Sequence, residues 1–76
     1  MVSQTIRALL EQTFPDASVD VVDRTGGGDH FHVTVGSTAF EGLSLVEQHR
    51  LVNRALAEPL ADGSIHELRI TTKGHP

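Results

Sequence analysis

The chain has 76 residues, no cysteine and a formal net charge of −4. This length predicts one small domain, residues 1–76, which buries only about 60–65% of the surface that its unfolded form exposes. Without cysteine there is no disulfide, thiolate ligand or cysteine nucleophile, and no apolar run is long enough to span a membrane, so we expect a cytoplasmic protein.

The first fourteen residues predict a helix. Apolar residues recur there with helical period, at Val2, Ile6, Leu9, Leu10 and Phe14. Ser3 is the candidate N-cap, and Pro15 ends the helix because the residue before a proline avoids the α region. A short strand around Val19 and Val21 is expected next.

Three consecutive glycines, Gly26–Gly28, followed by Asp29, predict a loop, since glycine is costly in any regular element. The favoured interpretation is a hairpin connection between antiparallel strands. The alternative, a phosphate-binding loop, lacks the lysine and serine or threonine pair that should follow. From His30 to Val35 apolar and polar residues alternate, which predicts a strand with Phe31 facing the core and His32 facing away.

A second helix is predicted after Phe40. Ser44 and Glu47 have the spacing of a capping box. An apolar stripe then follows at helical spacing, through Leu45, His49, Val52, Leu56 and Leu60. We assign His49 a structural role because it lies in this stripe, and we expect Pro59 to disturb the pattern.

The last strand is predicted from Ile65 to Thr72, after a turn at Asp62–Gly63. A strand–helix–strand crossover between neighbouring strands is right-handed and makes the two strands parallel. The predicted fold is therefore α+β, in the order α-β-β-α-β, with a three-stranded mixed sheet covered on one face by both helices.

Several motifs in this order resemble those of the BolA family. They are Phe40-Glu41-Gly42, His49-Arg50-Leu51-Val52-Asn53, Leu56, and Ile65-His66 with Leu68 and Ile70, all within residues 30–72. The resemblance implies a fold similar to a class II KH domain. The sequence has no catalytic constellation of a nucleophile with a nearby base, so we expect a non-enzymatic role. The resemblance also implies a monothiol glutaredoxin as partner, in a heterodimer that shares a [2Fe–2S] cluster for iron–sulfur trafficking or iron and redox regulation. Some members are described as transcriptional regulators or stress-response factors.

The family resemblance places a cluster ligand at His66. The alternative is a histidine that only hydrogen-bonds the start of the strand. His30 is the candidate second ligand, because parallel strands start at the same sheet end, about 5 Å apart. Strand alternation nominally points it to the opposite face from His66, although the end of a strand can relax this. His32 is the fallback, and a solvated strand histidine is as good an interpretation for either.

Two imidazoles do not complete a four-ligand site, so any cluster needs thiolates from a partner. Two other hypotheses remain. One is a DNA-binding regulator that uses Arg50, Asn53 and Arg54 on the polar edge of the second helix; the other is an adaptor without metal. The negative net charge disfavours DNA, and no two glycines stand three apart, as the nucleic-acid clamp of a KH domain requires. The family often has a basic residue where this chain has Gln48.

Overall fold

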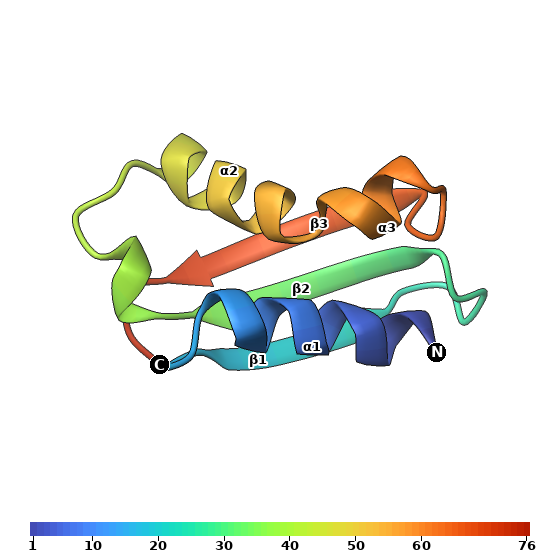
Figure 1. The fold of residues 1–76 in the computed structure, drawn as a ribbon, viewed down its shortest axis with the longest axis horizontal. Coiled ribbons are helices and arrows are strands. Elements are labelled where there is room, and N and C mark those ends of the chain that lie inside the picture. The colour runs from blue at the N-terminus through green and yellow to red at the C-terminus, as the bar shows by residue number, and fades with distance from the viewer.

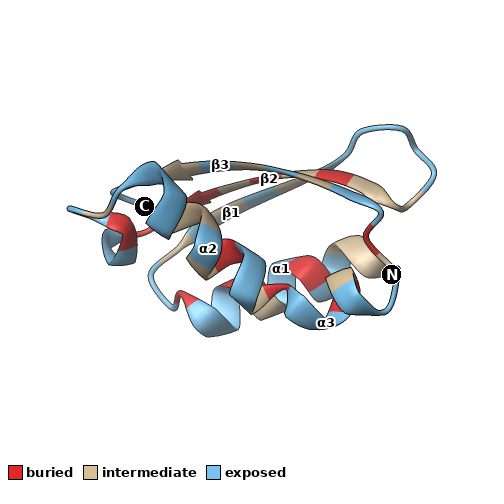
Figure 2. Ribbon diagram, turned by 90° about the horizontal axis from the view of Figure 1, so that it is seen from above, coloured by how far each residue is buried: buried red, intermediate tan, exposed pale blue.

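The computed structural model describes residues 1–76 and places the helices on one face of a three-stranded sheet (Figures 1 and 2). The elements, in chain order, are α1 (Val2–Thr13), β1 (Ser18–Asp23), β2 (His30–Gly36), the 3₁₀ helix η1 (Thr38–Phe40), α2 (Leu45–Ala55), α3 (Ala57–Ala61) and β3 (Glu67–Lys73). None of the helices has the length and apolar character that crossing a membrane requires. The predicted α+β class and element order are confirmed, with η1 and α3 as additions.

The sheet has the order β1-β2-β3, with β1 antiparallel to β2 and β2 parallel to β3. This confirms the predicted hairpin and the predicted crossover. The register aligns apolar side chains in rows: Val21 pairs with Val33, and Phe31 pairs with Leu68. All of these residues face the helices, so one face of the sheet forms the floor of the core.

The last strand begins at Glu67, two residues later than predicted. A parallel strand can pair only where its neighbour exists, and β2 itself starts at His30, which lies opposite Glu67. Ile65, before the strand, is buried in the core instead. His66 consequently lies between a buried residue and the first strand residue, outside the alternation of the sheet.

Helix α1 ends at Thr13, as Pro15 predicts, but Ser3 is not its cap. The N-cap is Met1, without a side-chain hydrogen bond, and Ser3 lies within the first turn. Val2 packs against the core. Burial of this side chain accounts for a helix that begins one residue before the predicted cap.

Helix α2 begins at the predicted capping box. The Ser44 hydroxyl accepts a hydrogen bond from Glu47 N (3.2 Å), and the Glu47 carboxylate accepts one from Ser44 N (3.3 Å). The helix ends at Ala55, and α3 starts separately after Leu56. Pro59 explains the break, because it has no N–H to donate to Ala55 and its ring collides with that carbonyl in a continuous helix.

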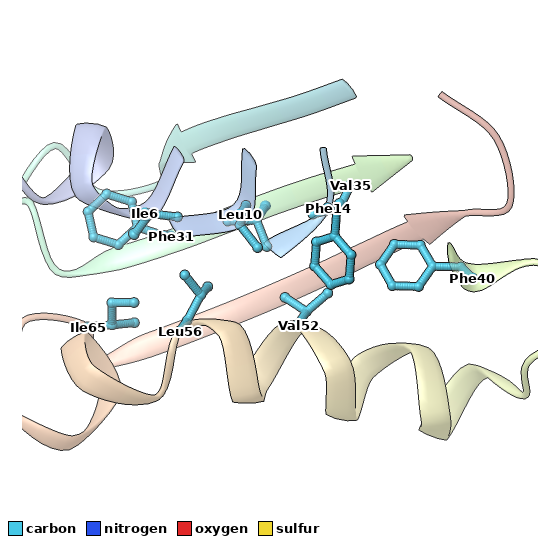
Figure 3. Packing of buried hydrophobic residues seen from close by; sticks show 10 residues of the cluster. Ile6, Leu10, Phe14, Phe31, Val35, Phe40, Val52, Leu56 and Ile65 are labelled. Atoms are coloured by element: carbon cyan, nitrogen blue, oxygen red, sulfur yellow. The ribbon is translucent and has the colours of Figure 1, made fainter. Parts of the chain in front are cut away.

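The core lies between the sheet and the helices (Figure 3). Its ten buried residues are Ile6, Leu10, Phe14, Phe31, Val33, Val35, Phe40, Val52, Leu56 and Ile65. The rings of Phe14 and Phe40 are 5.0 Å apart between centroids, at an interplanar angle of 55°. Such tilted aromatic pairs stabilise a core beyond the area they bury.

The apolar stripe of α2 was expected to cover the core along its length, and this was wrong at Leu45, because this residue is 62% exposed. Leu45 is the first residue of α2, and the helix diverges from the sheet toward this end (Figure 1). Val52 and Leu56, further along the same stripe, are fully buried. Periodicity identified the correct face of the helix but not the length over which that face meets the sheet.

Gln48 ties α2 to the chain on both sides of it. Its amide nitrogen donates to the carbonyl oxygens of Phe40 (3.3 Å) and Leu43 (2.9 Å), before the helix. Its amide oxygen accepts a hydrogen bond from the Thr72 hydroxyl, in β3. A neutral amide, which both donates and accepts, suits this position better than a basic side chain, which only donates.

Asp16 holds η1 against the turn after α1. Its carboxylate accepts hydrogen bonds from the Ser37 hydroxyl (2.6 Å), Thr38 N (3.0 Å) and the Thr38 hydroxyl (2.7 Å). These bonds favour the ionised form, so they lower the pKa of Asp16 from 3.8 to about 2. The carboxylate thereby fixes the segment that delivers Phe40 to the core.

The substitution Leu56→Ala should destabilise the fold far more than Leu45→Ala. Leu56 is fully buried, and removal of a buried leucine costs about 2–5 kcal/mol of unfolding free energy. Leu45 is exposed, so its loss should change that free energy by about 0.5 kcal/mol or less. Urea denaturation followed by circular dichroism measures both. Equal destabilisation by the two substitutions would contradict the observed packing of α2.

The substitution Asp16→Asn should lower the melting temperature at neutral pH but not in strong acid. The folded-state pKa lies below the ordinary value, so the stabilisation is complete above pH 3.8 and is lost as the pH falls to about 2. Thermal unfolding followed by circular dichroism at a series of pH values should therefore show the wild-type and variant curves converging in this window. A difference that stays constant down to the lowest pH would show that the charge of Asp16 is not involved.

Candidate metal centre

In the glycine-rich loop between β1 and β2, the backbone N–H groups of the glycines donate hydrogen bonds to side chains of the same segment. The Asp23 carboxylate accepts hydrogen bonds from Gly26 N (3.0 Å) and Gly28 N (2.9 Å), and the Thr25 hydroxyl accepts one from Gly27 N (3.2 Å). Gly26 and Gly28 have φ of 77° and 79°, a region that other residues rarely adopt. These N–H groups, which a phosphate cradle would need, already have partners. The loop is the hairpin connection that the sequence predicts.

Asp29 follows this loop and joins β2 to the residues before β3. Its backbone oxygen accepts hydrogen bonds from His66 N (2.7 Å) and Glu67 N (3.2 Å). Its side-chain oxygens each contact one imidazole: Oδ1 lies 2.7 Å from His30 Nδ1, and Oδ2 lies 2.9 Å from His66 Nδ1. The two histidine rings are 6.3 Å apart between centroids and nearly perpendicular, at 84°. One residue thus connects both candidate ligands.

The contacts with Asp29 constrain which nitrogen of each neutral ring carries the hydrogen. The hydrogen bond from His30 lowers the pKa of Asp29 below its ordinary value of 3.8, and the bond from His66 adds to this effect. An ionised carboxylate only accepts hydrogen bonds, so Nδ1 of each ring must be the donor. The Nε2 atom of each neutral imidazole then has a free lone pair, which is the state that a metal requires.

The His66 side chain is 63% exposed, and the His30 side chain is 34% exposed. The His66 ring contacts Asp29 through one nitrogen, and its backbone N–H separately helps to anchor the start of β3. Strand alternation nominally directs His30 and His66 to opposite faces, but both rings contact the same carboxylate, that of Asp29, as the relaxation of a strand end allows. His66 precedes the strand, so the alternation of β3 does not determine the direction of its ring.

The structure does not bring His32 into this group. His32 lies on the open face of the sheet, where its Nε2 is 2.8 Å from the Thr71 hydroxyl. No cluster of three or more histidine, aspartate or glutamate side chains is arranged to hold a metal ion. The carboxylate of Asp29 contacts the rings and does not point with them at a common centre. His30 and His66 are the residues that would hold part of a cluster site, since two imidazoles are the number that one iron of a Rieske centre takes.

Asp29 was missed by sequence reasoning, which treated it only as the residue that follows the glycines of the loop. The signal was present, because a carboxylate next to a candidate histidine ligand is the usual partner of its second nitrogen. The sequence showed that Asp29 precedes His30. It did not show that the same carboxylate reaches His66.

The residues of the DNA-binding hypothesis lie on a different surface. Arg50, Asn53 and Arg54 are exposed on α2. The two arginines line a shallow depression together with Leu43, Glu47 and Leu51. The Asn53 amide donates to the His49 carbonyl oxygen (2.9 Å) within the helix.

Comparison with known proteins extends the resemblance to nearly the whole chain. Residues 10–75 match the family model of BolA-like proteins. BolA-like protein 1 of Mus musculus is 40% identical over an alignment of 79 positions, which covers 95% of this chain and 57% of that protein. The DNA-binding transcriptional regulator BolA of Vibrio cholerae is 38% identical, with coverage of 95% and 74%.

A solved structure shows the same fold. The structure of BolA1 from Arabidopsis thaliana superimposes with a TM-score of 0.87 at 31% identity, over 96% of this chain and 90% of that chain. The family match, the identity to curated relatives and the shared architecture agree. This chain belongs to the BolA family.

Proposed function

We propose that this chain is a non-enzymatic interaction module that joins a monothiol glutaredoxin around a shared [2Fe–2S] cluster. In this proposal His66 is one ligand, His30 is the second, and the protein is a cytoplasmic monomer until it forms the heterodimer. One observation carries the proposal: two imidazoles share one carboxylate through Nδ1 and keep Nε2 available. The glutaredoxin and the cluster come from the family resemblance.

The chemistry of the ligands supports a shared cluster. Histidine replaces cysteine on one iron of Rieske centres, and the other iron keeps thiolates. This chain has no cysteine, so the thiolates must come from the partner. When bound, the cluster supplies iron and sulfide for transfer or a redox signal. His66 is the more exposed of the two histidines, so it is the ligand that an approaching cluster can reach first.

The Asp29–histidine pairs also resemble part of a catalytic triad, in which a nucleophile is hydrogen-bonded to Nε2 of the histidine. Neither Nε2 has such a partner: the ring hydrogen bonds of His30 and His66 are those to Asp29 through Nδ1. This geometry favours ligation over nucleophilic catalysis.

A DNA-binding regulator is the second candidate, favoured by the exposed Arg50 and Arg54 and by the name of the Vibrio cholerae relative. The charge distribution weakens it. Glu47 lies beside Arg50, whose positive charge contributes to the lowered pKa of that carboxyl after the larger effect of Ser44. Together with the net charge of −4, this leaves little positive potential for phosphate contacts.

Mixing the pure protein with a cluster-loaded monothiol glutaredoxin should change the visible absorption and circular dichroism spectra. His66→Ala should abolish the change, because the exposed ligand is lost, and His30→Ala should weaken the apparent affinity, because the second ligand is lost. His32→Ala is the matched control and should leave the spectra of the mixture unaltered. An unchanged spectrum with the wild-type protein would refute the proposed function.

Binding to duplex DNA at physiological salt should be no tighter than non-specific binding, with a Kd of about 10⁻⁴ M or weaker. Fluorescence anisotropy of labelled DNA measures it. The double substitution Arg50→Ala and Arg54→Ala tests α2, and Arg69→Ala with Lys73→Ala removes the same charge from β3. Tighter binding that only the α2 pair abolishes would establish the second candidate instead.

A further inference from the structure

The Asp29 carboxylate is hydrogen-bonded to His30 and to His66, so neither of its oxygens is free to bind a metal together with the two rings. Each carboxylate oxygen lies within 3 Å of a different Nδ1 atom, at 2.7 Å for His30 and 2.9 Å for His66. The Nε2 atoms lie on the other side of their rings from these contacts. The carboxylate therefore controls how both rings are turned and which nitrogen each ring presents.

We propose that Asp29 is a positioning residue that fixes His30 and His66 in the Nδ1–H tautomer and presents both Nε2 atoms to the incoming cluster. The identity of the group that those atoms bind rests on the proposed function. The tautomers and their dependence on Asp29 are independent of the proposed function, because they are properties of the protein alone.

The physical reason is the ambiguity of neutral imidazole. Without a partner, either ring nitrogen can carry the hydrogen, and a ring with hydrogen on Nε2 has no lone pair there for a metal. A carboxylate at Nδ1 removes this ambiguity, and it also makes the imidazole a stronger donor to the metal. Here one carboxylate serves two rings, so a single residue prepares both ligands.

Asp29 is itself held in place by contacts that do not involve its carboxylate. Its backbone oxygen binds two N–H groups, of His66 and Glu67. The preceding loop is tied to Asp23 through Gly26 N and Gly28 N. The Asp29 side chain is only 34% exposed. Its carboxylate therefore forms hydrogen bonds with both rings before any metal is bound.

Substitution by asparagine gives a sharp test, because an amide cannot replace a carboxylate here. Asn at position 29 has one acceptor oxygen and one donor NH₂ group. The oxygen can accept from the Nδ1–H of one ring, but the NH₂ group can bind the other ring only if that Nδ1 is unprotonated. The second ring must then carry its hydrogen on Nε2, where it blocks metal binding.

The measurement is ¹⁵N NMR of the histidine rings in the protein alone, at a pH well above the ordinary histidine pKa of about 6.5. Both rings of the wild type should have protonated Nδ1 and unprotonated Nε2. Asp29→Asn should convert one ring to the Nε2–H form, and Asp29→Ala should release both rings to mixed tautomers. Asp20→Asn, in β1, removes a carboxylate with no histidine contact and should change neither ring. Backbone amide spectra confirm folding, and the isosteric Asn variant preserves the test if the Ala variant unfolds.

Mixing with cluster-loaded glutaredoxin then tests the consequence. Asp29→Asn should weaken the apparent affinity about 10-fold to 100-fold, the usual effect of removing a carboxylate behind a histidine ligand. If the tautomers change as expected but no mixture changes its spectrum, the positioning role stands and the proposed function fails. If the wild-type rings carry hydrogen on Nε2, or if Asp29→Asn leaves both tautomers unchanged, the positioning role is wrong whatever the mixtures show.

Discussion

The parallel pairing of β2 with β3 is the constraint on which the rest of the structure depends. It brings His30 and His66, which are far apart in the sequence, to one end of the sheet. The same register places Leu68 beside Phe31 over the core. A slip by one residue would turn the apolar side chains of β3 to solvent, so the hydrophobic effect strongly selects this register. Core packing and the approach of the two histidines are therefore consequences of one strand alignment.

The two ends of the sheet are held by different carboxylates. At the end where the histidines lie, the backbone and side chain of Asp29 join the hairpin loop to the start of β3. At the other end, η1 follows β2 (Figure 1), and Asp16 binds it through Ser37 and Thr38. Both carboxylates are stabilised in their ionised forms by these bonds.

An incomplete ligand set is consistent with a protein whose proposed function is to share a cluster. Two imidazoles supply only half of the ligands that a [2Fe–2S] centre needs, so binding would depend on a partner with thiolates. In that proposal, preparation of the rings by Asp29 would reduce the reorganisation that cluster binding requires, because both imidazoles would already have the tautomer that a metal needs. The basic edge of α2 lies on a separate element, and its arginines are accompanied by Glu47.

The sequence by itself determined the α+β class, the hairpin, the crossover and the capping box of α2, because these follow from local periodicity, glycine and proline chemistry and the handedness of crossovers. It also provided the candidate ligands, His66 through the family resemblance and His30 through its place at a strand start. It failed where the answer depended on long-range contacts. The exposure of Leu45 follows from the tilt of α2 against the sheet, and the late start of β3 follows from where β2 begins. The hydrogen bonds of Asp29 to two imidazoles were decided only by the tertiary structure, since no local sequence pattern specifies that one carboxylate will contact rings from two distant segments.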